Sequence, residues 1–588
     1  MRRGLVRNAR VAVIDTGLSP LSPVSSCVID SYALYQGTSG WEIHKTLIED
    51  FVGHGTAVSY ILWNTNKNID ITIFRICNNE LNVDESGLVK VLEFIYKNIE
   101  IDIINISAGV TYLYDYTAIN DICSKLTKKG VIIVSAFDNN GAVSFPAALD
   151  SVVGVDVKND VKKDEIIYVE NGKFNLLVSD RYYRTLWLNT KTIIKGTSFA
   201  CAHISGLLAA KVGYYSDVVP MIHSICSKTI SLKKRKKFIK PNFNIRRAIV
   251  FPINKESHAL LRFKDKLNFE LVGAYDDRLS GKVGKSIFGE IVKSFDDIDW
   301  QENFDTIILS CVSDLTALTR RNYVEEILSK SKYFGKNVYS FEPLPLSDES
   351  IYYPYIEKNN VPIENDLKLY KVTIPVVGVV GTSSKQGKFT MQQKIIYQLT
   401  QLGYDVGSII TEPSGYLFNA DYVFHFGYHA NLNLSPSEYI ATLNEMIFEV
   451  QLKQKDIIIT GCQSGVIHYN NSHINEFAIS QYSFLLGTLP DVFILCVNPH
   501  DDFDYIKKTI DFLNSIDEGK VKAIVVFPMK AIATLSGIGY KIEQVDNNEY
   551  SRIKNELEQQ FNLPVFSMND NDTSQICSLI IDEFSNDV

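Results

Sequence analysis

The stretch GTSFACAHISG, residues 196–206, places Ser198 at the start of an apolar, helix-like segment. A serine at a helix start is usually a cap, and it becomes a candidate nucleophile when a base lies near it. Two other short stretches supply the partners, because GHGTAV contains His54 and VAVIDTG contains Asp15. Together the three stretches predict a serine nucleophile, a histidine base and an orienting aspartate, in the chain order Asp, His, Ser.

The residues around these motifs alternate between strand-like and helix-like patterns. Apolar runs typical of buried strands are followed by amphipathic segments, and this rhythm predicts a parallel sheet with helices on both faces. Asp15 ends the first apolar run, which would place it at the edge of the sheet where α/β enzymes keep their chemistry. The predicted strands are residues 11–14, 71–76, 101–106, 131–136 and 152–157, and the predicted helices are residues 87–96, 118–126 and 197–213.

The three motifs, in this order, resemble those of the subtilisin family, whereas chymotrypsin-like enzymes and α/β-hydrolases carry their triads in other orders. The resemblance implies a subtilisin-like parallel-sheet protease domain over residues 1–232. In such a domain Ser198 would attack the peptide carbonyl and His54 would take and return its proton. Asp15 would orient the imidazole and stabilise its cation. Neither a metal nor a cofactor is expected for proteolysis.

Two further stretches extend the resemblance to substrate binding. DIINISAG is similar to the family's substrate-binding strand, which assigns this role to Ser107, Ala108 and Gly109. VSAFDNNG is similar to its oxyanion segment, so the side-chain amide of Asn139 and the backbone N–H of Ser198 would stabilise the oxyanion. The family's Ala-Gly-Asn context here reads Phe-Asp-Asn, which predicts bulk and a charge near the P1 pocket.

The remainder of the chain predicts a linker and two more α/β domains. The basic run SLKKRKKFIKPNF indicates a solvated linker over residues 233–245, and contact with RNA or an acidic partner is the alternative interpretation. In residues 246–370 the patterns predict a Rossmann-like α/β domain without a catalytic constellation. Residues 371–588 begin with a buried-type strand that enters GTSSKQGKFT, which predicts a P-loop α/β domain.

The stretch GTSSKQGKFT has the context of a phosphate-binding loop, since it follows a strand and precedes a helical pattern. Backbone N–H groups between Gly381 and Gly387 would cradle phosphate, Lys388 would add a positive charge, and Thr390 would reach Mg²⁺. ATP or GTP with Mg²⁺ is the expected ligand, and a plain glycine-rich turn is the alternative. Five residues separate the two glycines, a spacing that resembles the dethiobiotin synthetase branch of P-loop proteins. The acid usual after a second strand is missing, and Glu412 is the candidate replacement.

Residues 246–588 also resemble proteins described as peptide-maturation components, which are encoded beside radical enzymes and small bacteriocin-like precursors. The shared features are GTSSKQGKFT, TEPSGYLF with Asp421, GYH, CQSG and LLGTLPDVFILCVNPHDD. This resemblance implies a biological context and carries no mechanism.

The composition of the chain restricts its partners and its compartment. The formal net charge of −9 argues against a general nucleic-acid binder, which is usually basic. No apolar run reaches the ~18 residues that span a bilayer, and the basic N-terminus lacks the apolar segment of a signal peptide. The nine cysteines stand singly without a CxxC pair, which is typical of free thiols in a reducing compartment. We therefore expect a cytoplasmic bacterial protein that binds neither nucleic acid nor membranes.

These observations predict an intracellular subtilisin-like serine endopeptidase that removes the leader from a ribosomally synthesised precursor peptide. Its expected partners are the precursor peptide and other peptide-maturation enzymes, and its C-terminal half is a candidate NTPase. The alternative is a regulatory or scaffold protein that binds peptides, with the P-loop as a switch and weak or absent protease activity.

Overall fold

The computed structural model describes residues 7–38, 40–76, 84–215, 217–238, 240–345, 348–426, 432–469, 478–533 and 540–585. The chain divides into two compact units. The first unit comprises Met1–Arg235 and Pro362–Thr373, and the second unit comprises Lys236–Val361 and Ile374–Val588. The GYH motif at residues 427–429 lies outside the described residues.

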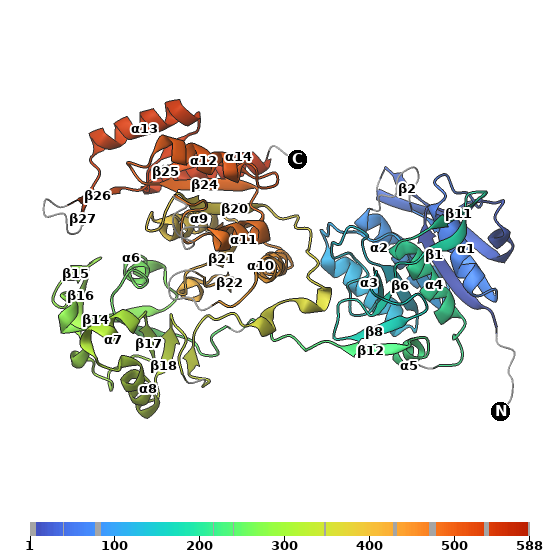
Figure 1. Cartoon of the computed structure of the whole chain (residues 1–588), viewed down its shortest axis with the longest axis horizontal. Coiled ribbons are helices and arrows are strands. Elements are labelled where there is room, and N and C mark those ends of the chain that lie inside the picture. Colours follow the sequence, from blue (N-terminus) through green and yellow to red (C-terminus); the bar gives the residue numbers. More distant parts are fainter. Residues whose placement is uncertain are drawn as a thin grey trace. The chain divides into compact units, whose positions relative to one another are not determined.

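The first unit is built on a ten-stranded, mostly parallel sheet in the order β12-β8-β9-β7-β6-β5-β1-β4-β2-β3. Helices α1 and α4 pack together on one face, and α2 and α3 pack together on the other (Figure 1). Because both faces are covered, the central strands are buried throughout, as their continuous apolar runs predict. The strands are β1 (Ala9–Asp15), β2 (Val28–Gly37), β3 (Gly40–Lys45), β4 (Ile69–Arg75), β5 (Ile103–Ile106), β6 (Ile132–Ala136), β7 (Val153–Lys158), β8 (Ile166–Glu170), β9 (Leu176–Ser179) and β12 (Lys228–Ser231).

The helices of this unit follow the predicted rhythm. The helix expected over residues 197–213 ends earlier, where the chain turns over residues 210–214. A separate hairpin, β10 (Tyr183–Trp187) with β11 (Thr190–Ile194), packs against α1. The helices are α1 (His54–Thr65), α2 (Glu85–Asn98), α3 (Tyr116–Lys128), α4 (Thr197–Ala209) and α5 (Val218–His223).

The second unit contains two sheets, the first in the order β15-β16-β14-β13-β17-β18-β19. Its first main strand, β13, lies between β14 and β17, so the strand order reverses direction there. The strands are β13 (Arg247–Phe251), β14 (Glu270–Asp276), β15 (Ser286–Ile287), β16 (Glu290–Ser294), β17 (Thr306–Leu309), β18 (Asn337–Ser340) and β19 (Ile351–Tyr352). The helices are α6 (His258–Arg262), α7 (Ser313–Thr319) and α8 (Tyr323–Phe334).

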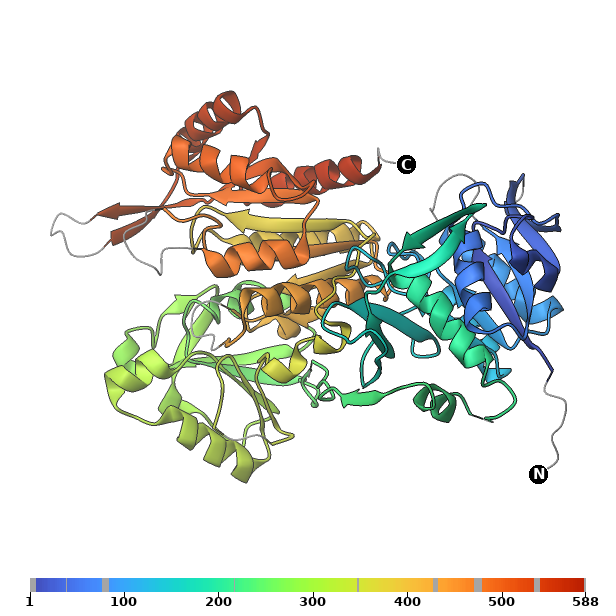
Figure 2. The same cartoon turned by 45° about the vertical axis from the view of Figure 1, so that its right-hand side comes forward.

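The other sheet of this unit is parallel, in the order β22-β21-β23-β20-β24-β25-β28, and carries helices on both faces (Figure 2). Strand β20 lies between β23 and β24 and leads into GTSSKQGKFT, as predicted. The strands are β20 (Val376–Gly381), β21 (Val406–Ile410), β22 (Tyr422–Val423), β23 (Ile457–Gly461), β24 (Val492–Val497), β25 (Lys520–Val526) and β28 (Val565–Phe566), and β26 (Met529–Ala533) pairs with β27 (Tyr540–Gln544) outside the sheet. The helices are α9 (Lys388–Gln401), α10 (Pro436–Gln451), α11 (Ile479–Thr488), α12 (Phe503–Leu513), α13 (Asn547–Phe561) and α14 (Asp570–Ser585).

The predicted α/β fold class is therefore confirmed, with three parallel-sheet layers along the chain. The expected domain boundary between residues 370 and 371 falls inside Pro362–Thr373, a segment that packs with the first unit. The expected linker over residues 233–245 is partly engaged, because Arg235 forms an ion pair of 3.2 Å with Glu364 and both side chains are largely buried.

Two further predictions from the sequence concern the cysteines and membrane-spanning helices. Every cysteine that the structure describes is a free thiol, as their single spacing predicts. Among the described residues, the helices are all too short or too polar to cross a lipid bilayer.

Candidate active site

The three predicted triad residues lie at the ends of secondary-structure elements in the first unit. Asp15 is the last residue of β1, His54 is the first residue of α1, and Ser198 is the second residue of α4. His54 Nδ1 donates to Asp15 Oδ1 over 2.8 Å, and both side chains are buried. The imidazole also packs on the ring of Phe199, with centroids 5.3 Å apart, which places it beside the start of α4.

The first turn of α1 is held by a residue that sequence reasoning missed. The carboxylate of Asp50 accepts the N–H of Gly53, and both the N–H and the hydroxyl of Thr56. It also accepts the hydroxyl of Thr16, whose own oxygen accepts the N–H of Gly55. This network satisfies the N–H groups that a helix start leaves open and fixes the backbone at the histidine. In the sequence, this role of Asp50 was indicated by an acidic residue shortly before a His-Gly pair that begins a helix.

The electrostatics of His54 suit a general base. Burial disfavours the charged imidazole, but the charge of Asp15, its hydrogen bond and the charge of Asp50 outweigh this effect, so the pKa of His54 is raised. Asp15 Oδ2 is buried and has no hydrogen-bond partner among the described residues. The negative charge of that carboxylate therefore acts mainly on the imidazole, in a region of low dielectric.

The hydroxyl of Ser198 points away from the base in this structure. It donates to the backbone carbonyl of Ser107 over 2.7 Å, and within the described part of the chain no hydrogen bond joins it to His54. A rotation about χ1 of the serine would redirect the hydroxyl, and catalytic hydrogen bonds often tighten only when substrate binds. The geometry describes a resting arrangement of the triad.

The side-chain amide of Asn139, the predicted oxyanion donor, is held by the first residue of α4. Its Oδ1 accepts the N–H and the hydroxyl of Thr197, both at 3.0 Å, which leaves the NH₂ group facing away from these donors. Gly196 next to it has φ +138°, and a Cβ there would lie 3.2 Å from Asn139 Oδ1. A side chain at residue 196 would therefore be strained and would crowd the amide.

The predicted substrate-binding strand lies beside the nucleophile. The hydroxyl of Ser107 donates to the carbonyl of Ser198 over 3.3 Å. Strand β5 ends at Ile106, so Ser107, Ala108 and Gly109 form an irregular segment after it. Val110 then pairs with Phe145 through two 2.8 Å backbone hydrogen bonds.

The two residues expected to bring bulk and charge near the P1 pocket have partners within the domain. Phe137 is fully buried and packs edge-to-face on Phe174. Asp138 accepts the N–H of Asn140 over 2.8 Å and so stabilises the turn that contains Asn139.

The backbone of the glycine-rich loop in the second unit curves in the way that phosphate-binding loops do. Gly387 has φ +71°, a left-handed backbone conformation that favours glycine. Gln386 accepts the N–H of Ser383 and donates to the hydroxyl of Thr382 over 2.5 Å, which closes the loop on itself. Lys388 begins α9, is buried, and donates to the carbonyl of Ser383 over 2.5 Å. Burial lowers the pKa of this lysine.

The contacts around the loop differ from the expected metal ligands. Thr390, predicted to reach Mg²⁺, accepts a 2.5 Å hydrogen bond from the guanidinium of Arg262. Burial, followed by the charge of Glu256, raises the pKa of Glu412 to about 7, so this acid is partly protonated at neutral pH. No group of three or more His, Cys, Asp or Glu side chains suited to a metal ion occurs among the described residues. Asn498 donates to the hydroxyl of Ser383 and so supports the loop.

Comparison with known protein families matches two parts of the chain. Residues 7–220 match the subtilase family, and residues 364–577 match a domain of unknown function described as the DUF1611 P-loop domain. The chain is thus a subtilase domain fused to a DUF1611 P-loop domain.

Individual relatives cover one half or the other. Subtilisin DY of Bacillus licheniformis is 26% identical over 224 residues, which are 35% of this chain and 78% of that protein. A DUF1611 family protein from Anabaena variabilis has a TM-score of 0.41 and 15% identity, and covers 58% of this chain and 100% of its own. The prenylagaramide maturation protease PagA has a TM-score of 0.28 and 20% identity, and covers 35% of this chain and 76% of its own.

The DUF1611 match begins inside a segment that packs on the subtilase domain. Val143, in the oxyanion loop, donates its N–H to the carbonyl of Leu369 over 2.9 Å. Lys371 forms a parallel bridge with Tyr112, beyond the substrate-binding strand. Residues 369–371 therefore support two segments of the subtilase domain, around Val143 and Tyr112, although they lie far from them in the sequence.

The segment is anchored by an ion pair between Lys368 and Asp156. The two groups are 3.0 Å apart, with side chains 13% and 4% exposed. We expect Lys368→Met to leave a buried carboxylate without its cation, at a cost of about 3–5 kcal/mol in unfolding free energy. Thermal unfolding and peptide hydrolysis would measure the loss, and the double variant with Asp156→Asn should recover most of it.

A matched control is the neighbouring pair of Lys158 and Asp366, which is 2.8 Å apart but half-exposed. Exposed pairs contribute about 0–1 kcal/mol, so Lys158→Met should change unfolding little. Equal stability of Lys368→Met and Lys158→Met would contradict the anchoring role.

The raised pKa of His54 predicts the acid limb of the pH–rate profile. A general base must be neutral, so kcat/KM of the subtilase domain should fall below an apparent pKa that lies above the ordinary value of about 6.5. Asp15→Asn removes the charge that raises this pKa and should shift the limb to lower pH. Glu42→Gln, next to the exposed His44, is the control and should leave the limb in place. A limb that does not move in Asp15→Asn would refute the assignment to His54.

Proposed function

We propose that the subtilase domain is a serine endopeptidase that removes the leader from a ribosomally synthesised precursor peptide. The observation that carries this proposal is the buried hydrogen bond between His54 and Asp15, at the same sheet edge as Ser198 and the oriented amide of Asn139. The leader-removal role is supported by the resemblance of residues 246–588 to peptide-maturation components.

Two measurements test this proposal. A fluorophosphonate probe should label Ser198 in the full-length chain, because labelling requires a nucleophile activated by its base. Cleavage of an unbiased peptide library should then give one narrow consensus. Absence of labelling would favour the alternative, a peptide-binding regulatory protein, and broad cleavage would remove the processing role.

We further propose that the DUF1611 domain binds ATP or GTP at its glycine-rich loop. The cradle and the position of Lys388 fit a phosphate group. A contact between Thr390 and Mg²⁺ fits less well, because the hydroxyl is occupied by Arg262. A bound nucleotide would supply a transferable phosphoryl group, and the chain's own contribution is to hold and neutralise the phosphates.

We expect Lys388→Ala to weaken ATP or GTP binding at least about tenfold, because a buried cation then no longer faces the phosphates. Hydrolysis of a short peptide should stay nearly unchanged, since separate folded units couple weakly by default. Isothermal titration with each nucleotide and Mg²⁺ measures the first effect. Lys394→Ala, on the same helix but paired with the exposed Asp570, is the control. If the wild type releases no heat with either nucleotide, the loop is a structural turn.

A further inference from the structure

The second unit contains a cavity of about 610 Å³, lined by loops of its first sheet and by part of the glycine-rich loop. Its floor is formed by the loops that follow β13, β14 and β17, through residues such as Ile253, Lys282 and Leu315. Its other wall comes from the P-loop, through Ser384 and Lys385, and from the loop after β23. Small-molecule sites in proteins have volumes of about 300–1,000 Å³, so the size suits one ligand.

The topology of the two sheets explains why a site forms here. Strand β13 lies between β14 and β17, and strand β20 lies between β23 and β24. Each sheet therefore has a point at its carboxyl edge where the strand order reverses, and α/β proteins bind ligands in the crevice at such points. The cavity is bounded by the loops of both crevices. One crevice holds the proposed nucleotide loop, and the other holds no assigned ligand.

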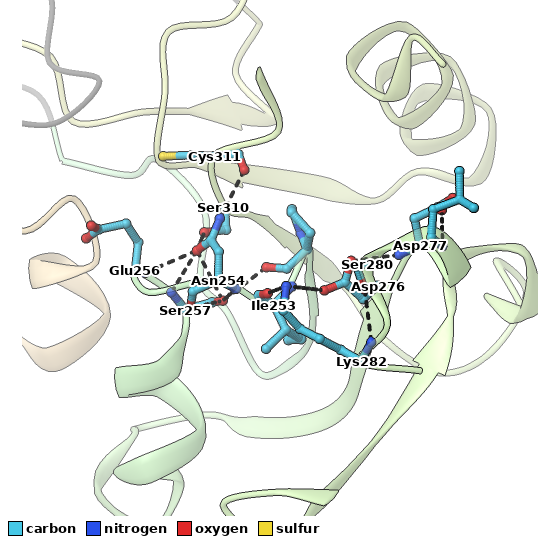
Figure 3. A network of polar contacts seen from close by, with 12 residues as sticks. Ile253, Asn254, Glu256, Ser257, Asp276, Asp277, Ser280, Lys282, Ser310 and Cys311 are labelled. Atoms are coloured by element: carbon cyan, nitrogen blue, oxygen red, sulfur yellow. Dashed lines mark hydrogen bonds and ion pairs between the residues drawn. The ribbon is translucent and has the colours of Figure 1, made fainter. Parts of the chain in front are cut away.

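The polar groups of the second crevice are already in place (Figure 3). Asp276 accepts the N–H groups of Ile253 and Asp277 and the ammonium of Lys282, which lies 3.1 Å away. Lys282 also donates to the carbonyl of Ile253 over 2.5 Å. An ammonium has three N–H donors, so one remains for a ligand. Because two bonds fix this lysine, little side-chain entropy would be lost on binding.

The charges around the cavity favour an anion. Of its three carboxylates, Asp276 pairs with Lys282 and Glu256 lies 3.6 Å from Lys255. The third, Asp314, lies next to Leu315 in α7. Lys385, held at φ +62° in the P-loop, has no acidic partner among the described residues. The cavity therefore presents one fixed and one uncompensated ammonium. Apolar side chains also line the cavity, namely those of Pro252, Leu315 and Leu318.

We propose that this cavity binds a small molecule with a carboxylate and a hydrocarbon body, as a second ligand beside the P-loop nucleotide. The carboxylate lies between Lys282 and Lys385, and the body packs on Leu315 and Leu318. A phosphate group would find a full set of backbone N–H donors at the glycine-rich loop instead, so a carboxylate suits the two-lysine arrangement better. The proposal rests on the proposed nucleotide site for its biological use, but the binding itself does not depend on a nucleotide.

The test compares three probes of one shape on the full-length protein. Hexanoate, hexanamide and hexylamine carry the same body with a negative, a neutral and a positive head. Ligand-observed NMR should show saturable binding of hexanoate in the roughly millimolar range, with hexanamide and hexylamine at least about tenfold weaker. Equal binding of hexylamine, or no saturable binding of hexanoate, would overturn the proposal.

Variants locate the bound probe. Leu318 is 64% exposed, so Leu318→Glu should fold normally and weaken hexanoate at least tenfold by charge repulsion, whereas Leu318→Lys should not weaken it. Lys282→Met should weaken hexanoate by a similar factor. Lys336→Met is its control, since Lys336 also bonds two backbone carbonyls but does not line the cavity. Unchanged affinity in Leu318→Glu would place the probe elsewhere and refute the site.

Failure of the nucleotide proposal can be told apart from failure of this one. Lys388→Ala should lose nucleotide binding and keep hexanoate. If the wild type binds hexanoate but no nucleotide, the cavity site stands and the P-loop assignment falls. If ATP displaces hexanoate competitively, the cavity belongs to the nucleotide, and a separate carboxylate site is excluded.

Discussion

Replacement of Ser198 by alanine should abolish peptide cleavage, with a fall in kcat on the order of a million-fold, the size known for the subtilisin triad. The hydroxyl is the attacking group, and its recorded hydrogen bond is a donation to the carbonyl of Ser107. Its removal costs that one bond, about 0.5–1.5 kcal/mol, so the protein should still fold. Peptide hydrolysis and thermal unfolding of the full-length protein measure both effects.

Two further variants test this prediction. His54→Ala should reduce kcat about as much, and the double variant should be no slower than either single one, because the residues act as a unit. Ser224→Ala removes a serine that only bonds the carbonyl of Met221 near the end of α5, and it should leave turnover intact. Comparable turnover by Ser198→Ala and wild type would show that the cleavage comes from another group.

Replacement of Asn139 by alanine should lower kcat by roughly 100–1,000-fold and change KM little. The amide is used mainly when the tetrahedral oxyanion forms, so its loss affects the transition state more than the bound substrate. Thr197→Val keeps the amide but removes one of the two bonds that orient it, and should cause a smaller loss of kcat.

The neighbouring Asn140 is the control, because it is exposed and its recorded bond is made by its backbone N–H to Asp138. Asn140→Ala should behave like the wild type. If Asn140→Ala loses kcat and Asn139→Ala does not, the oxyanion donor has been assigned to the wrong amide. Steady-state kinetics on one peptide substrate, with kcat and KM reported separately, decides between them.

Both predictions rest on side chains whose positions follow from the ends of β1, α1, β6 and α4. Parallel strands place their carboxyl ends along one edge, so motifs at these ends converge whatever lies between them.

Short-range patterns were sufficient for much of this protein. Apolar runs predicted the strands of both units, because buried parallel strands have no polar face. The motifs around Asp15, His54 and Ser198 could each be recognised from neighbouring residues alone. The same holds for the glycine-rich loop, since the strand before Gly381 and the helix after Gly387 are visible in the chain itself.

Contacts between residues distant in the chain were decided only by the folded structure. The support of the oxyanion loop by Leu369, the ion pair of Lys368 with Asp156, and the bond from Arg262 to Thr390 join segments separated by more than a hundred residues. Such pairs leave no periodicity or spacing in the sequence, because their partners are chosen by how sheets and loops pack rather than by neighbouring residues. For the same reason, the cavity lined by loops of both sheets could not be predicted from the sequence and was found only in the folded structure.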